Sequence, residues 1–162
     1  MEIIKDFLSE EKHKQIKAML IGNGAFPYYY RDSTADKEDK SYFMFNHALF
    51  FENQPTTNSS NILTIILPLL SKVKHEQLIR AKVNLYTKSV EPIITGFHID
   101  QDEPHKVLLY SVNTNNGYTL FENGDKVPSV ANQAVIFDGH LKHSSVTQTD
   151  ENIRVNININ YK

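Results

Sequence analysis

The 162-residue sequence contains no cysteine and no tryptophan, and only three of its 17 basic residues are arginine. The lack of cysteine excludes disulfide bonds, thiolate nucleophiles, and zinc or iron–sulfur centres held by cysteine. Long apolar runs are also missing: the longest, residues 62–70, is interrupted by Thr64 and Pro68 and is far too short to cross a bilayer. The charged N-terminal residues lack the apolar stretch of a signal peptide. We therefore expect a cytoplasmic protein with no membrane partner.

The sequence carries no strong charge of either sign. Lysine and arginine number 17 and aspartate and glutamate 19, which gives a formal net charge of −2. Nucleic-acid-binding proteins usually show a basic domain or stripe, so we expect no nucleic-acid partner. Hydrophobic residues make up 40% of the chain and charged residues 22%, a balance that suits one globular core. The length is that of one domain, so residues 1–162 are expected to fold as a single unit.

A helix is predicted near the N-terminus. Ser9 is followed by two glutamates and is suited to cap a helix, and Ile16, Met19 and Leu20 recur at the spacing of one helix face. The pair at 23–24, Asn-Gly, predicts the end of this helix.

Two strands and a second helix are predicted next. Aromatic residues at 26–30 and bulky residues at 41–53 indicate strands. Ser60 is a suitable N-cap for an apolar helix that runs to about Val73, and Pro68 should kink it or mark a restart. Between the strands, residues 31–40 are mostly charged and predict an exposed loop.

From residue 78 onward the sequence changes to short β-type runs separated by Gly, Asn, Asp and Pro. These runs lie at residues 78–89, 105–113, 118–123, 132–139 and 153–162. Strands that follow two helices indicate an α+β, mainly β, protein. We expect a sandwich or jelly-roll core over 78–162, supported by helices and strands from 1–77.

The last of these runs alternates strictly between polar and apolar residues. Arg154 and three asparagines share one face of the strand, and Val155, Ile157 and Ile159 share the other. Two arrangements fit this pattern. Either the asparagines face water, or they line a cavity.

Residues 96–100, Gly-Phe-His-Ile-Asp, carry the sharpest local signal. In an extended strand His98 and Asp100 project to the same side, about 7 Å apart, which suits two ligands of one metal. His143 follows an apolar strand later in the chain. Two histidines and one carboxylate with open positions suit non-haem Fe(II). Taken alone, His-x-Asp also fits a surface histidine beside a turn aspartate.

Arg154 lies eleven residues after His143 on the alternating strand. A guanidinium offers a planar fork for a carboxylate, with better bidentate geometry than lysine. An exposed strand arginine with no ligand is the other interpretation of this residue.

The order and spacing of these residues resemble the iron(II)/2-oxoglutarate-dependent dioxygenases, in particular the small prolyl-4-hydroxylase-like members, including compact phage-type ones. The resemblance rests on RAKVNLY, GFHID, LLYSVNTNNGYTLFENG, VPSVANQAVIFDGHLKHSS and IRVNININY. It implies a double-stranded β-helix, Fe(II) at its mouth, 2-oxoglutarate as co-substrate and O2 as oxidant, with ascorbate as a supporting reductant. It also implies a peptide, protein or small-molecule substrate, and admits a virus-encoded enzyme acting in the host cytoplasm.

Carried over residue by residue, the resemblance implies that His98, Asp100 and His143 hold the metal. Arg154 matches the residue that binds the distal carboxylate of 2-oxoglutarate. His140 competes with His143 for the third ligand position, but its spacing to Arg154 is less like that of the family.

Further co-substrate contacts follow from the same resemblance. Tyr86 matches a tyrosine that helps to hold the oxoacid, and Asn158 lies on the same strand face as Arg154. A second family tyrosine has no clear counterpart, because the alignment puts Ser111 at that position and turns Tyr110 to the opposite side. Residues 117–118, Gly-Tyr, match a segment that approaches the substrate.

The implied activity is hydroxylation of an unactivated C–H bond, with a prolyl residue of a peptide or protein as the favoured target. Hydroxylation or demethylation of a free amino acid or nucleobase remains an alternative, as does a non-catalytic jelly-roll binding module. Residues 31–40 would then act as a lid over the substrate. The remaining histidines are expected to have surface or packing roles: His13, His47, His75 and His105.

Overall fold

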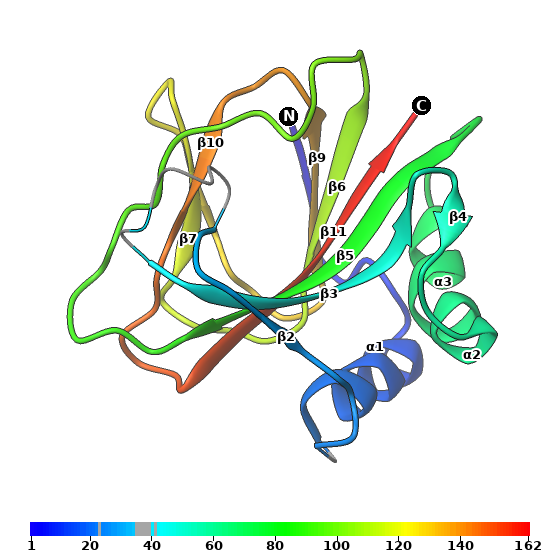
Figure 1. Cartoon of the computed structure of the whole chain (residues 1–162), viewed down its shortest axis with the longest axis horizontal. Helices are drawn as coiled ribbons and strands as arrows, with labels where there is room; N and C mark the ends of the chain where they lie inside the picture. Colours follow the sequence, from blue (N-terminus) through cyan, green and yellow to red (C-terminus); the bar gives the residue numbers. More distant parts are fainter. Residues whose placement is uncertain (23, 35–39, 41) are drawn as a thin grey trace.

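Two antiparallel β-sheets face each other in the computed structural model, which describes residues 1–22, 24–34, 40 and 42–162 (Figure 1). The larger sheet contains, in spatial order, β1 (Glu2–Ile4), β9 (Gln133–Asp138), β6 (Lys106–Ser111), β11 (Ile153–Tyr161), β5 (Leu78–Thr87), β3 (Met44–Phe51) and β2 (Tyr29–Arg31), with β4 (Gln54–Pro55) beside β3. The smaller sheet contains β10 (His143–Val146), β7 (Tyr118–Phe121) and β8 (Lys126–Pro128). The mainly β, jelly-roll class predicted from the sequence is confirmed.

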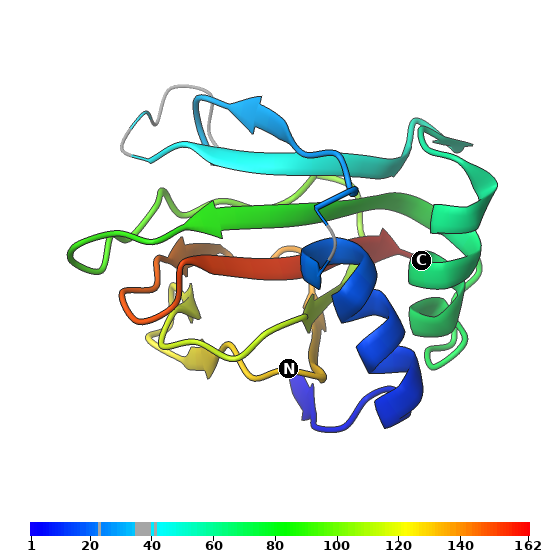
Figure 2. The same ribbon diagram turned by 90° about the horizontal axis from the view of Figure 1, so that it is seen from below.

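The central strands β5 and β11 are paired over their whole length and run beside β3 (Figure 2). On β11, Val155, Ile157 and Ile159 belong to the main hydrophobic cluster. The asparagines of the same strand are also buried, but they lie on the face turned toward the smaller sheet. Of the two arrangements open to this strand, the cavity-lining one is therefore correct.

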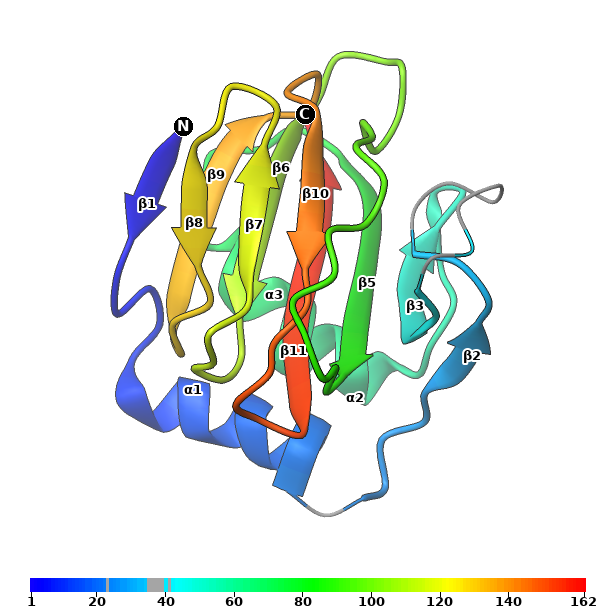
Figure 3. The ribbon, with the colours of Figure 1, turned by 90° about the vertical axis from the view of Figure 1, so that its left-hand side faces the viewer.

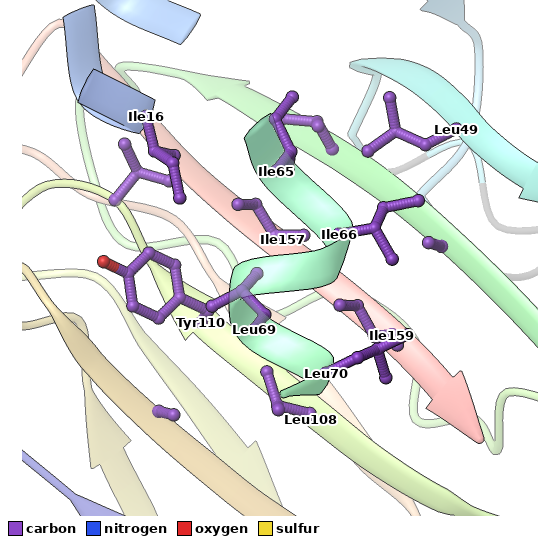
Figure 4. Packing of buried hydrophobic residues seen from close by; sticks show 14 of the residues in the cluster. Ile16, Leu49, Ile65, Ile66, Leu69, Leu70, Leu108, Tyr110, Ile157 and Ile159 are labelled. Carbon is purple, nitrogen blue, oxygen red and sulfur yellow. The ribbon is translucent and has the colours of Figure 1, made fainter. Parts of the chain in front are cut away.

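Two helical segments cover the outer face of the larger sheet. The first is α1 (Glu10–Lys17), which continues as a π-helical turn, η1 (Ala18–Gly22). The second consists of α2 (Ser59–Asn61), the π-helical η2 (Ile62–Ile66) and α3 (Leu67–Leu70). Their apolar side chains pack against β6 and β11, as Figure 4 shows for Ile16, Ile65, Ile66, Leu69, Leu70, Leu108, Tyr110, Ile157 and Ile159. None of the helices in the described residues is long and apolar enough to span a membrane.

The helix ends agree only in part with the sequence-based expectations. Ser9 is the N-cap of α1, and its hydroxyl accepts a hydrogen bond from the Lys12 amide at 3.3 Å. The second helical segment is capped by Asn58 rather than Ser60, since the Asn58 side chain accepts from the Asn61 amide at 2.9 Å. Pro68 lies in the first turn of α3, directly after a π-helical stretch. Proline lacks the amide hydrogen that a continuous α-helix needs, and the wider π turns accommodate that loss.

The strand boundaries also differ in places. The aromatic strand expected at 26–30 is displaced to Tyr29–Arg31. All five β runs after residue 78 contain strands, but β8 and β10 were missed because each is short and β10 is polar. His143 is the first residue of β10.

The buried face of the second helical segment should account for a large share of the stability. We expect Leu69→Ala, which empties a fully buried site, to lower the free energy of unfolding by about 2–5 kcal/mol. The matched change Leu67→Ala, on the 47% exposed leucine of the same segment, should cost less than about 1 kcal/mol. Urea unfolding followed by circular dichroism measures both, and equal losses would contradict this packing.

Candidate metal centre

The backbone brings His98 and His143 together. His98 lies on the extended segment that follows β5, and it forms an isolated bridge to His143, the first residue of β10. In that bridge each amide donates to the carbonyl of the other residue, both at 3.0 Å. The imidazole centroids are 4.5 Å apart as a result. Asp100 follows two residues later, and the ligand atoms of His98, Asp100 and His143 all lie within 4.8 Å of one another.

Both imidazoles are held in the tautomer that a metal needs. The Nδ1 of His98 donates to the Gly96 carbonyl at 3.3 Å, and the Nδ1 of His143 donates to the Leu141 carbonyl at 3.0 Å. A carbonyl oxygen can only accept, so each Nε2 keeps its lone pair for a metal ion. Burial, reinforced by the neighbouring His143, lowers the pKa of His98 to about 4, and burial also lowers the pKa of His143. Both rings are therefore neutral near pH 7, as ligation requires.

The Asp100 carboxylate is buried and surrounded by donors. Its Oδ1 forms an ion pair with Arg80 Nη2 at 2.6 Å. Its Oδ2 accepts hydrogen bonds from the side-chain amides of Asn158 at 3.1 Å and Asn160 at 2.9 Å. Burial alone would raise the pKa of Asp100, but the charges of Lys82 and Arg80 hold it well below its usual range. Asp100 is thus ionised and fixed in orientation.

These contacts follow from the register between β5 and β11. Directly opposite residues share one face of an antiparallel pair. The inner face therefore carries four facing pairs, which are Arg80 with Asn160, Lys82 with Asn158, Asn84 with Asn156, and Tyr86 with Arg154. The smaller sheet lies over this polar surface, with β10 in front of β11 (Figure 3).

A hollow that is partly open to solvent lies between the two sheets. The metal-ligand candidates line it, together with side chains from both sheets and from the segment after β2: Thr34, Lys82, Asn84, Tyr86, Thr95, Leu109, Thr119, Ser145, Asn156 and Asn158. Apart from Leu109, nearly all of these side chains carry polar atoms. Such a hollow suits a small, highly polar ligand.

Arg154 lies at the inner end of this surface and is only 2% exposed. Its Nη1 donates to the Val146 carbonyl at 3.0 Å and its Nη2 to the Thr119 hydroxyl at 3.4 Å, whereas its buried Nε has no partner among the described residues. The guanidinium lies 5.3 Å from the ring centroid of Tyr86. Burial lowers the pKa of Arg154, and the described part of the chain provides no carboxylate to pair with it. A buried guanidinium of this kind is strongly stabilised by an anionic ligand.

The residues around Arg154 complete its surroundings. Tyr86 is buried, and its hydroxyl accepts a hydrogen bond from Ser145 at 3.1 Å. A Cβ atom at Gly117 would come within 3.2 Å of Arg154 Cδ and 3.0 Å of the Val146 carbonyl, so only glycine lets the chain pass behind this arginine. Tyr118 faces Lys126 instead, whose Nζ lies 5.2 Å from the ring centroid.

Tyr110 points away from the hollow, as the alignment implied. It is fully buried beneath the helices, where its hydroxyl donates to Asn132 Oδ1 at 3.0 Å and lies 2.7 Å from His13 Nδ1. Leu109 is the residue of this strand that lines the hollow. Near Arg154 and Tyr86, hydroxyl groups come from Thr119 and Ser145 rather than from a second tyrosine.

His140 is not part of the cluster. It is exposed, its Nε2 lies 2.8 Å from the Asp102 carbonyl, and its Nδ1 lies 3.7 Å from Asp138 Oδ1. The other histidines make local contacts with backbone carbonyls or hydroxyls: His13, His47, His75 and His105.

Half of the expected lid, residues 35–39, lies outside the described residues. Of the residues predicted to form it, Arg31 ends β2 and Thr34 lines the hollow.

Arg80, Lys82 and Asn160 also surround the Asp100 carboxylate, and none of them was predicted from the sequence. A usable signal was present, since residues 80–86 alternate polar and apolar side chains just as the last strand does. Two alternating strands that pair with each other predict one shared polar face.

The two candidate third ligands can be separated by mutation. Loss of a residue that only supports a metal ligand typically weakens metal binding roughly 10–100-fold. His143→Ala removes one of the three ligands themselves, so we expect it to weaken Mn(II) or Fe(II) binding by more than this. His140→Ala should leave the affinity nearly unchanged. Calorimetric titration with Mn(II) measures both, and the reverse order would move the ligand to His140.

No protein-family model and no curated protein matches the sequence. Solved structures do match the fold. An oxidoreductase of the 2OG-Fe(II) oxygenase family from Burkholderia pseudomallei aligns with a TM-score of 0.74 and 12% identity, over 98% of this chain and 84% of its own. A prolyl hydroxylase from Trichoplax adhaerens, in complex with a hypoxia-inducible-factor peptide fragment, aligns with a TM-score of 0.65 and 14% identity, over 99% and 82%.

The same fold also carries other reactions. The non-haem α-ketoglutarate-dependent epimerase SnoN from nogalamycin biosynthesis aligns with a TM-score of 0.66 and 13% identity, over 99% of this chain and 76% of its own. Similarity at these identities establishes the fold, while the chemistry has to be argued from the site. The chain therefore has the jelly-roll fold of the 2OG-Fe(II) oxygenases, the family that its motifs resemble.

Proposed function

We propose that this protein is an Fe(II)- and 2-oxoglutarate-dependent dioxygenase that hydroxylates an unactivated C–H bond. The observation that carries the proposal is the buried Arg154, without a carboxylate partner among the described residues, in the same interior as a His-Asp-His cluster. A dicarboxylic oxoacid satisfies both features, because one end can reach the metal while the other pairs with the guanidinium.

The donor set fits Fe(II). Two neutral imidazoles and one ionised carboxylate offer ligand atoms within 4.8 Å of one another and leave the side facing the hollow open. That is the facial arrangement typical of non-haem Fe(II) oxygenases. Bound Fe(II) would supply O2 activation coupled to oxidative decarboxylation of 2-oxoglutarate, which gives succinate and CO2 and leaves one oxygen atom for the substrate.

The chain's own residues bind and orient. Arg154 would hold the distal carboxylate of 2-oxoglutarate through its fork, with Tyr86 packed against the guanidinium and Thr119 hydrogen-bonded to it. Asn158, Asn160 and Arg80 keep the Asp100 carboxylate turned toward the two histidines. In this assignment Asn158 supports a ligand of the metal, instead of donating to the co-substrate as first expected.

For the primary substrate, we propose a prolyl residue of a peptide or protein. Support comes from the shared fold with the Trichoplax hydroxylase, which is seen with a peptide. Incubation with Fe(II), 2-oxoglutarate, O2 and ascorbate should release succinate. Mass spectrometry of proline-containing peptides should then show the gain of one oxygen atom. Absence of Fe(II)-dependent succinate formation, with or without peptides, would leave a binding module as the better account.

The co-substrate assignment makes a separate prediction. A charge-assisted hydrogen bond contributes roughly 1.5–3 kcal/mol, so Arg154→Ala should weaken 2-oxoglutarate binding about 10–100-fold or more while Mn(II) binding changes little. Arg154→Lys should restore only part of the affinity, because an ammonium lacks the planar fork. Calorimetry on the Mn(II)-loaded protein measures these affinities. The exposed Arg31→Ala serves as control, and an unchanged affinity in Arg154→Ala would refute the assignment.

A further inference from the structure

The charge of Lys82 helps to keep Asp100 ionised, and its side chain lines the same hollow as the three metal-ligand candidates, but the proposed chemistry gives its ammonium no ligand to bind. It lies in the middle of β5, opposite Asn158 of β11 and Ala48 of β3. Its neighbour two residues earlier, Arg80, is already occupied by the ion pair with Asp100. Over the described ranges, the Lys82 ammonium itself makes no hydrogen bond or ion pair.

The position of Lys82 separates it from the co-substrate end of the hollow. Tyr86, which faces Arg154, lies four residues further along β5. At the usual rise of a strand this is a distance of roughly 13 Å. A five-carbon diacid that reaches from the metal ligands to Arg154 is shorter than this span. Lys82 therefore lies at the end of the hollow that holds the metal-ligand candidates, because Asn158, its partner on β11, donates to Asp100 at 3.1 Å.

The charges of the loaded site leave Lys82 without a counter-ion. Arg154 balances the distal carboxylate of the oxoacid, and a divalent metal balances Asp100 together with the carboxylate that it binds. The charges of Arg80 and Lys82 remain. Asp100 is the only acidic side chain among the described residues that line the hollow. A partly buried site with an excess of positive charge favours an anionic ligand.

Other polar atoms in the hollow also lack partners. Three buried oxygen atoms have no hydrogen-bond partner in the described part of the chain: Thr34 Oγ1, Asn84 Oδ1 and Asn158 Oδ1. Buried polar atoms are nearly always paired, so a group of unpaired ones marks a place where a ligand or ordered water completes the set. The Thr34 hydroxyl can donate to a carboxylate, and the amide oxygens can accept from a neighbouring N–H group.

We propose that Lys82 binds a carboxylate group of the primary substrate, next to the carbon that is oxidised. The inference rests on the proposed function and deepens it. The carboxylate has two possible sources: the main-chain carboxylate of a free amino acid, or an acidic side chain beside the target residue of a peptide. Lysine suits either source, because its ammonium is a compact charge that makes no demand for planar pairing.

Two matched ligand pairs test the proposal on protein loaded with Mn(II) and 2-oxoglutarate. The first pair is L-proline and L-prolinamide. The second is an N-acetylated, C-amidated tetrapeptide of sequence Ala-Pro-Glu-Ala and its Ala-Pro-Gln-Ala counterpart. Mn(II) is paramagnetic, so the NMR relaxation of ligand protons reports binding near the metal without turnover. We expect the acid of one pair to bind about tenfold or more tightly than its amide, and the responding pair identifies the source.

Variants at Lys82 connect this preference to the residue. Lys82→Met should abolish the preference for the acid, and Lys82→Arg should keep most of it. In Lys82→Met the affinity for 2-oxoglutarate should stay unchanged, and Mn(II) affinity should stay the same or rise, because a positive charge near the metal is removed. Lys88→Met, on an exposed lysine just beyond the end of β5, is the matched control and should leave the preference intact.

Several outcomes would overturn the proposal. Equal binding of acid and amide in both pairs does so, as does an acid preference that survives in Lys82→Met. Weakened Mn(II) binding in Lys82→Met would make Lys82 a positioning residue for Asp100, and weakened 2-oxoglutarate binding would assign it to the co-substrate. If the unaltered protein binds neither Mn(II) nor 2-oxoglutarate, the proposed function fails; if it binds both without an acid preference, only the present inference fails.

Discussion

The antiparallel pairing of β5 with β11 is the constraint on which the rest of the structure depends. Both strands alternate polar and apolar residues, and their register puts the polar side chains of residues 80–86 and 154–160 on one face. A shift by a single residue would turn these side chains into the hydrophobic cluster and expose the apolar ones. The register is therefore strongly specified, and it determines the contacts to Asp100, the buried position of Arg154 beside Tyr86 and the position of Lys82 together.

The opposite face of the same strands stabilises the fold. Ile157 and Ile159 pack with the helical segments at Ile16, Ile65 and Leu69, and all five of these side chains are fully buried. This cluster removes apolar area from water without contributing to the hollow. Stability and chemistry are thus assigned to opposite faces of one sheet, so the inner face can keep polar groups that a core would not tolerate.

The inner face is polar, buried and only partly satisfied. Asn158 and Asn160 bind the Asp100 carboxylate, and Asn84 donates to Asn156 at 2.9 Å. Within the described residues, the buried Nε of Arg154 and the Oδ1 atoms of Asn84 and Asn158 have no hydrogen-bond partner. Unpaired buried groups cost free energy, and a ligand that pairs with them recovers that cost.

The sequence alone determined the fold class, the first helix with its Ser9 cap, and the strand alternation, because these depend on neighbours a few residues apart. The motif order also singled out His98, Asp100, His143 and Arg154. The structure brings the first three together at one hollow and buries Arg154 against Tyr86, which lines the same hollow. Only the tertiary structure decided between alternatives that local pattern could not separate. In the folded protein the asparagine face of β11 is buried, and Asn58 rather than Ser60 caps the second helical segment. A short polar stretch forms β10, and Arg80 pairs with Asp100. Each of these depends on a partner brought near by folding, as the bridge between His98 and His143 does across 45 residues of chain, and no local propensity encodes such a partner.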